Sequence, residues 1–106
     1  MKKISYNKLV RDKIPEIIEA SGKKYTVESM DKKEHLNYLI KKLQEELNEY
    51  YENNEIEELA DLVEVIYGIL SLEGISIKDF HSMREKKNSE RGKFRKGLKL
   101  LEVIED

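Results

Sequence analysis

Apolar residues recur at helical spacing through a long stretch in the middle of the chain. The stretch follows Asp31 and Glu34, whose spacing is typical of the capping box that begins many helices. Its apolar positions recur every three or four residues, with Leu39 and Ile40 side by side, and continue to about Tyr51: Leu36, Leu39, Ile40, Leu43, Leu47 and Tyr50. Asn53 and Asn54 then interrupt the pattern. The stretch therefore predicts a long amphipathic helix.

Two further helices are predicted after this break. An apolar pattern covers about residues 55–73 and ends at Gly74, a residue type that often follows the last turn of a helix. Ser76 and Asp79 are spaced as at a helix start, and the helix that they begin is expected to end near Arg91. Because two long helices joined by a few residues lie antiparallel, the expected architecture is an antiparallel helical bundle.

The two ends of the chain carry weaker patterns. Asp12 is placed to cap a short first helix, with Pro15 in its opening turn and Ser21–Gly22 at its end. Residues 25–27 alternate in the manner of a short extended segment, and residues 94–104 fit neither the helical nor the strand period. The prediction is an all-α protein whose two central helices are the best defined elements.

The length of the chain limits the size of its core. The chain has 106 residues, enough for a single domain over residues 1–106 with a modest hydrophobic core. The apolar arc of the helix predicted for residues 55–73 is broad for a surface helix, which favours burial against another subunit. We therefore expect the core of the bundle to be completed by oligomerisation.

The composition excludes several classes of protein. The chain has no cysteine, which rules out disulfides and thiolate metal sites. No apolar run approaches the roughly 20 residues of a membrane span, and the first residues do not form a signal peptide. We expect a soluble cytoplasmic protein without a membrane partner.

The net charge of −2 conceals a strong segregation of charges. Residues 44–77 contain ten acidic and no basic side chains, whereas residues 78–99 contain nine basic and three acidic ones. The first thirteen residues add five basic side chains and one acidic one. This layout suits the binding of a metal-chelated polyphosphate, with carboxylates on the metal and basic side chains on the phosphates. The alternative is one acidic and one basic face that are simply solvated. The acidic centre argues against a nucleic-acid partner.

Four acidic side chains are predicted to point inward from the central helices. At about 100° per residue, Glu46 and Glu49 lie on one flank of the first apolar face, and Glu58 and Asp61 lie on one flank of the second. Four converging carboxylates repel one another unless a cation intervenes, and oxygen ligands favour Mg²⁺ or Mn²⁺ over Zn²⁺. The alternative is that lysine or arginine side chains neutralise them. Three other acids are predicted to face solvent: Glu45, Glu57 and Glu64.

These acids belong to two segments with the spacing of a known signature. Residues 45–49 read EELNE and residues 57–61 read EELAD. Their order resembles the E-E-x-x-E … E-x-x-D signature of the MazG-like nucleotide pyrophosphohydrolases. Residues 6–15, YNKLVRDKIP, and residues 87–94, KNSERGKF, resemble the opening and the basic segment of small members labelled phosphoribosyl-ATP pyrophosphohydrolase-like. The resemblance covers nearly the whole chain.

The resemblance implies a hydrolase of the all-α nucleoside triphosphate pyrophosphohydrolase type. Such an enzyme cleaves between the α and β phosphates and releases a nucleoside monophosphate and pyrophosphate. The implied cofactor is Mg²⁺, or Mn²⁺ in its place, and the implied assembly is a homodimer or homotetramer. Glu46 or Glu49 is the expected acceptor of the proton of the attacking water. The resemblance leaves open which base is preferred and whether the role is to clear damaged nucleotides from the pool. The implied metal ligands are Glu46, Glu49, Glu58 and Asp61.

Six further residues are predicted to contact the nucleotide: Lys8, Arg11, Asp12, Lys87, Asn88 and Arg91. Lys87 and Arg91 are one helical turn apart and are expected to stabilise charge on the leaving pyrophosphate. Asp12 is either a helix cap or a ligand for the sugar or base. The alternative for Lys8, Arg11 and Asn88 is that they are exposed polar side chains without a role in binding.

A different class of protein fits the same helical pattern. A non-catalytic dimerisation or adaptor module would keep the fold without turnover. It predicts that the inward acids are paired with basic side chains and bind no metal. Turnover of a nucleotide distinguishes the two hypotheses.

Overall fold

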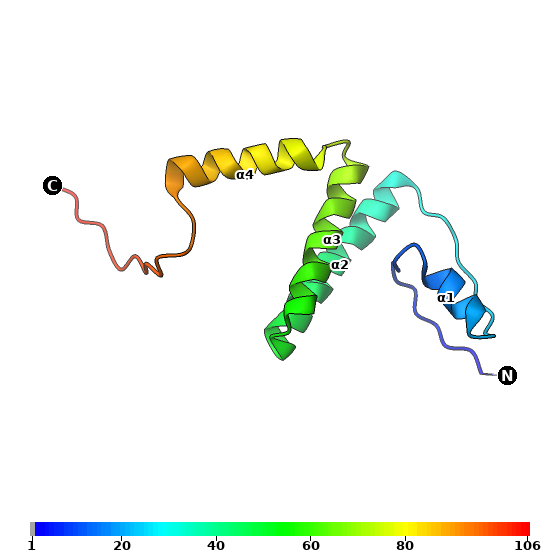
Figure 1. The fold of residues 1–106 in the computed structure, drawn as a ribbon. Helices are drawn as coiled ribbons and strands as arrows, with labels where there is room; N and C mark the ends of the chain where they lie inside the picture. The colour runs from blue at the N-terminus through cyan, green and yellow to red at the C-terminus, as the bar shows by residue number, and fades with distance from the viewer. Residues whose placement is uncertain (1) are drawn as a thin grey trace. The chain divides into compact units, whose positions relative to one another are not determined.

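The computed structural model describes residues 2–106 and contains four helices in that range (Figure 1). No strand occurs in these residues, so the prediction of an all-helical chain is confirmed. None of the helices combines the length and the apolar character needed to cross a membrane. The helices are α1 (Ile14–Ala20), α2 (Lys32–Asn53), α3 (Ile56–Leu72) and α4 (Ile77–Arg91).

The contacts within the chain divide it into two compact units. The first ends at Gly74 and contains α1, α2 and α3. The second, Ile75–Asp106, contains α4 and the residues that follow it. Residues after Gly92 form neither helix nor strand, in keeping with their lack of a clear period. All of the acids predicted to point inward lie in the first unit.

The predicted caps of the second and fourth helices are confirmed. The Asp31 side chain accepts a hydrogen bond of 2.8 Å from the backbone N–H of Glu34 at the start of α2. Ser76 Oγ accepts one of 3.0 Å from the backbone N–H of Asp79 at the start of α4. Each cap satisfies a backbone donor that the first turn of a helix leaves without a partner.

The first helix differs from the prediction at its start. Lys13 is the residue before α1, and no side chain caps the helix, so the prediction of Asp12 as the cap is wrong. A backbone hydrogen bond of 3.0 Å from the Ile14 N–H to the Arg11 carbonyl closes the preceding turn instead. Residues 25–27 form neither helix nor strand.

Helices α2 and α3 lie side by side and form a hairpin (Figure 1). They run antiparallel because only Asn54, in the left-handed conformation with φ 55°, and Glu55 separate them. Gly68 permits a close approach, since a Cβ atom at this position would lie 3.1 Å from Leu39 Cδ2. The hydrophobic core of the described residues is small and consists of Leu39, Val65 and Leu70.

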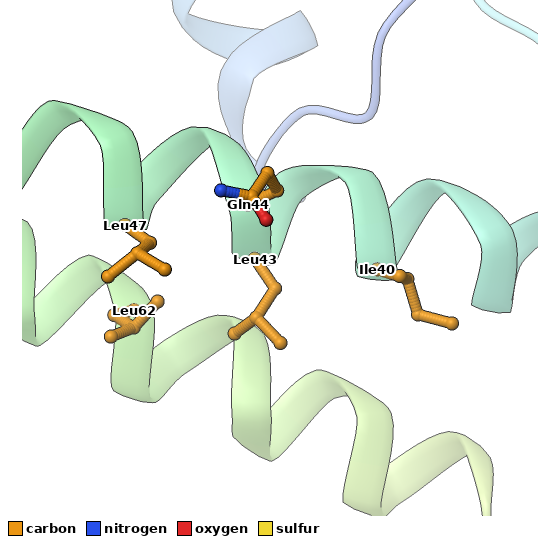
Figure 2. A pocket seen from close by; sticks show the side chains of 5 residues that line it. All are labelled: Ile40, Leu43, Gln44, Leu47 and Leu62. Atoms are coloured by element: carbon orange, nitrogen blue, oxygen red, sulfur yellow. The ribbon is translucent and has the colours of Figure 1, made fainter.

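Part of the apolar face of the hairpin stays open to solvent. An apolar groove of about 380 Å³ lies along it, and Figure 2 shows Leu43 and Leu47 reaching from α2 toward the helix that carries Leu62. Ile40 is 53% exposed and Leu47 is 49% exposed. The hairpin therefore does not bury its whole apolar stripe within one chain. The groove is lined by Ile40, Leu43, Gln44, Leu47 and Leu62.

Candidate metal centre

Carboxylates from both helices meet on one flank of the hairpin. Glu46 and Glu49 are three residues apart on α2, and Glu58 and Asp61 are three residues apart on α3. One oxygen from each of Glu46, Glu58 and Asp61, here called the hairpin triad, lies within 4.8 Å of the others. Glu49 lies close enough to Glu58 to raise the pKa of its carboxyl group. The structure thus brings the four predicted acids together.

A second group of carboxylates shares Glu46 with the first. Glu45, Glu46 and Glu49, here called the α2 triad, also have oxygens within 4.8 Å of one another. The prediction that Glu45 faces solvent is therefore wrong: its side chain is half-buried and its oxygen is in the cluster. A glutamate has three rotatable bonds, so its carboxylate can depart from the direction set by its Cα. Glu57 and Glu64 are exposed, as predicted.

Glu46 is the buried member that both triads share. Only 5% of its surface is exposed, and its Oε2 atom has no hydrogen-bond partner among the described residues. A buried oxygen without a partner destabilises the folded state. A cation bound beside Glu46 would remove this cost.

Two cations from the N-terminal segment contact the cluster. Arg11 Nη2 lies 2.7 Å from Asp61 Oδ1. Lys8 Nζ lies 3.7 Å from Glu45 Oε1. These predicted phosphate ligands therefore lie beside the candidate metal site, and each forms an ion pair with a carboxylate.

Lys42 is a third counterion, which was not among the site residues predicted from the sequence. Its Nζ atom lies 3.4 Å from Glu45 Oε1 and 3.6 Å from Glu46 Oε1. A spacing of three or four residues on one helix was the pattern that could have revealed these pairs. Glu49 and Glu58 have no ion pair within residues 2–106. When all five carboxylates of the two triads are ionised, the three cations Lys8, Arg11 and Lys42 leave an excess of two negative charges.

The cluster raises the proton affinity of two of its members. Burial, together with the charge of Glu49, raises the pKa of Glu46, although Lys42 acts in the opposite direction. The hydrogen bond that Glu58 shares with Glu49 raises the pKa of Glu58, and desolvation adds to this effect. Both shifts mean that the cluster is electrostatically unfavourable when fully ionised without an added cation.

The donor atoms fit a hard divalent cation. All are carboxylate oxygens, which Mg²⁺ and Mn²⁺ prefer. At a Mg²⁺–oxygen distance of about 2.1 Å, opposite ligands of one octahedral ion are about 4.2 Å apart. Oxygens within 4.8 Å of one another therefore need only small movements to share an ion. The charge excess of two equals the charge of one such ion.

Acidification is expected to stabilise the metal-free protein over part of the pH range. The pKa values of Glu46 and Glu58 are higher in the folded protein than in the unfolded chain, where a glutamate has a pKa of about 4.3. Their contribution to the stability of the folded protein is therefore present below the unfolded pKa and is lost as the pH rises through the folded pKa. In EDTA, the melting temperature should be higher near pH 5 than near pH 7.5. Adding Mg²⁺ should raise it more at the higher pH. Scanning calorimetry checks this, with Glu46→Gln expected to flatten the profile; a melting temperature that falls on acidification in EDTA would contradict it.

The remaining predicted substrate ligands lie before α1 and on α4. Asp12 is exposed in the turn before α1. Lys87 and Arg91 are exposed on α4 and Asn88 is half-buried there, all in the second unit. Their role as ligands of a nucleotide stays a prediction.

Comparison of the chain with family models, curated proteins and solved structures finds no match.

Proposed function

We propose that this chain is a Mg²⁺-dependent nucleotide pyrophosphohydrolase of the MazG-like kind. The observation that carries the proposal is the buried Glu46, which belongs to both carboxylate triads and has one oxygen, Oε2, without a hydrogen-bond partner among the described residues. The resemblance of residues 45–49 and 57–61 to the pyrophosphohydrolase signature supports the same assignment. Together they favour a metal-assisted phosphate chemistry over a purely structural role for the cluster.

The cluster has the groups that such a hydrolysis needs. A bound Mg²⁺ would offset phosphate charge and acidify a coordinated water, and Glu46, Glu49, Glu58 and Asp61 are the residues that would hold it. Glu46 and Glu49 remain the two candidates for the proton acceptor, and Glu49 is the more accessible to water because it is only half-buried. Lys8 and Arg11 supply positive charge at the edge of the cluster, where they can contact an anionic substrate.

Pyrophosphate release tests the proposal directly. The protein is incubated with a panel of nucleoside triphosphates and Mg²⁺, and pyrophosphate and nucleoside monophosphate are both measured. We expect the two products in equal amounts from at least one nucleotide, and we expect EDTA to abolish the reaction. Release of inorganic phosphate instead would indicate cleavage at another bond. No turnover by a protein that remains folded would contradict the proposal.

A non-catalytic adaptor is the second candidate, and one observation favours it. Asp61 and Glu46 each form an ion pair with a basic side chain, as an adaptor of this fold would predict. Glu49 and Glu58 have no such partner among the described residues, which leaves the cluster incompletely neutralised. This incomplete neutralisation is why we place the hydrolase first.

We also propose that the α2–α3 hairpin pairs with another copy of the chain. Only three apolar side chains are buried in the described residues, and no side chain is fully buried. Ile40 and Leu47 stay about half exposed beside the groove of Figure 2. A second hairpin laid on this face would bury both and complete a helical bundle.

A further inference from the structure

Residues 8–11, here called the N-terminal strap, connect to both helices of the hairpin. Lys8 pairs with Glu45 on α2 at 3.7 Å, and Arg11 pairs with Asp61 on α3 at 2.7 Å. The strap forms no helix or strand. Two cations three residues apart along the chain thus contact the same carboxylate cluster from outside the hairpin.

The two ion pairs engage one acid from each triad. Asp61 belongs to the hairpin triad, and Glu45 belongs to the α2 triad. A divalent cation bound in either triad would repel the guanidinium or ammonium group that already contacts the same carboxylate. The basic side chains and a metal ion therefore compete for the negative charge of the cluster.

The exposure of these pairs makes them replaceable. The Lys8 and Arg11 side chains are 48% and 59% exposed, so water can solvate them when they leave the carboxylates. Exposed ion pairs stabilise a protein only slightly. Lys42 differs, because its side chain is mostly buried and lies on α2 itself beside Glu46. The strap cations are therefore the counterions that a metal can displace most easily.

We infer that the N-terminal strap is a built-in counterion that a divalent cation displaces, which releases Lys8 and Arg11 for an anionic ligand. The strap occupies the cluster in the metal-free protein, and metal binding loosens its contacts with Glu45 and Asp61. Lys8 and Arg11 thus become available to a phosphate group once the metal ion is bound. The inference rests on the metal centre of the proposed function but not on hydrolysis itself.

Metal titration of strap variants tests this competition. Mn²⁺ alone is the probe, and calorimetry measures its dissociation constant for the full-length chain. Arg11→Gln and Lys8→Gln are each expected to bind Mn²⁺ about two- to fivefold more tightly than the unsubstituted chain, the range expected for removing one exposed competing charge. Lys13→Gln is the matched control, because Lys13 is exposed two residues from Arg11 and forms no ion pair within residues 2–106. It should leave the dissociation constant unchanged.

Trypsin cleavage provides a second readout that needs no variant. In the unsubstituted chain at constant ionic strength, Mg²⁺ should accelerate cleavage after Lys8 and Arg11 by about twofold or more relative to cleavage after Lys24, because cleavage follows the population of the open segment. Asp61→Asn should show faster cleavage after Arg11 without metal.

The outcomes separate the strap from the hydrolase. Unchanged or weaker Mn²⁺ binding in Arg11→Gln and Lys8→Gln would overturn the proposed displacement of the strap, even if hydrolysis is found. Slower cleavage after Lys8 and Arg11 in the presence of Mg²⁺ would overturn it as well. Tighter Mn²⁺ binding in both variants without any nucleotide turnover would support the displacement of the strap and contradict the proposed hydrolase activity. Absence of Mn²⁺ binding in every variant would overturn both the proposed metal centre and the proposed displacement of the strap.

Discussion

Asp61→Asn and Glu58→Gln are each expected to lower the rate of pyrophosphate release by about a hundredfold, as loss of a metal ligand or of its orientation does. Asp61 and Glu58 each contribute an oxygen to the hairpin triad. An amide keeps the shape of each side chain but removes the negative charge that would hold the cation. The rate is measured at saturating Mg²⁺ with the nucleotide that the unsubstituted chain turns over fastest.

Two acids on the same helix provide the controls for this loss. Glu57 and Glu64 are exposed, so Glu57→Gln and Glu64→Gln should keep nearly the full rate. Glu45→Gln is not a suitable control, because Glu45 belongs to the α2 triad and contacts Lys8 and Lys42. Equal rates in Asp61→Asn, Glu58→Gln and the two controls would show that the cluster does not take part in catalysis.

The double substitution Ile40→Glu/Leu47→Glu is expected to convert the assembly that we propose into monomers. In a symmetric pair of hairpins, each copy would bury these two side chains, so the variant removes four apolar side chains from the interface. Each is already about half-buried, and burial of the rest contributes about 1 kcal/mol. Their loss, about 4 kcal/mol in total, weakens association by about a thousandfold, and burying four carboxylates adds to this.

Light scattering after size-exclusion chromatography measures the change in mass. Val27→Glu is the matched control, because Val27 is 59% exposed and lies outside the α2–α3 hairpin. It should leave the mass unchanged. A monomeric mass for the unsubstituted chain at micromolar concentration would exclude the proposed dimer or tetramer.

The sequence alone specifies the helices, because their causes are local. The caps at Asp31 and Ser76 each need only a side chain three residues before a backbone N–H. The break at Asn54 follows from a residue type that tolerates the left-handed conformation. Asp12 failed as a cap because a backbone turn closed the start of α1 without it.

The sequence also determined which flank of each central helix carries its acids. A period of 3.6 residues orients Glu46 and Glu58 relative to the apolar stripe, and a two-residue connection between antiparallel helices brings the flanks together. The direction of a long side chain at the border of a helix face does not follow from this period. Glu45 illustrates this, since its carboxylate lies beside Lys8 of the N-terminal strap as well as beside Lys42, three residues earlier on α2.

Only the tertiary structure decided which cations from outside the two helices neutralise the cluster. The pair between Arg11 and Asp61 joins residues fifty positions apart, and no periodic pattern relates them. The burial of Glu46 and the unpartnered state of its Oε2 atom likewise depend on how closely α3 packs against α2. Spacing along a helix sets where a side chain starts, whereas the packing of distant segments sets which atoms surround its charge, and that environment determines whether the carboxylates are ready for a metal ion.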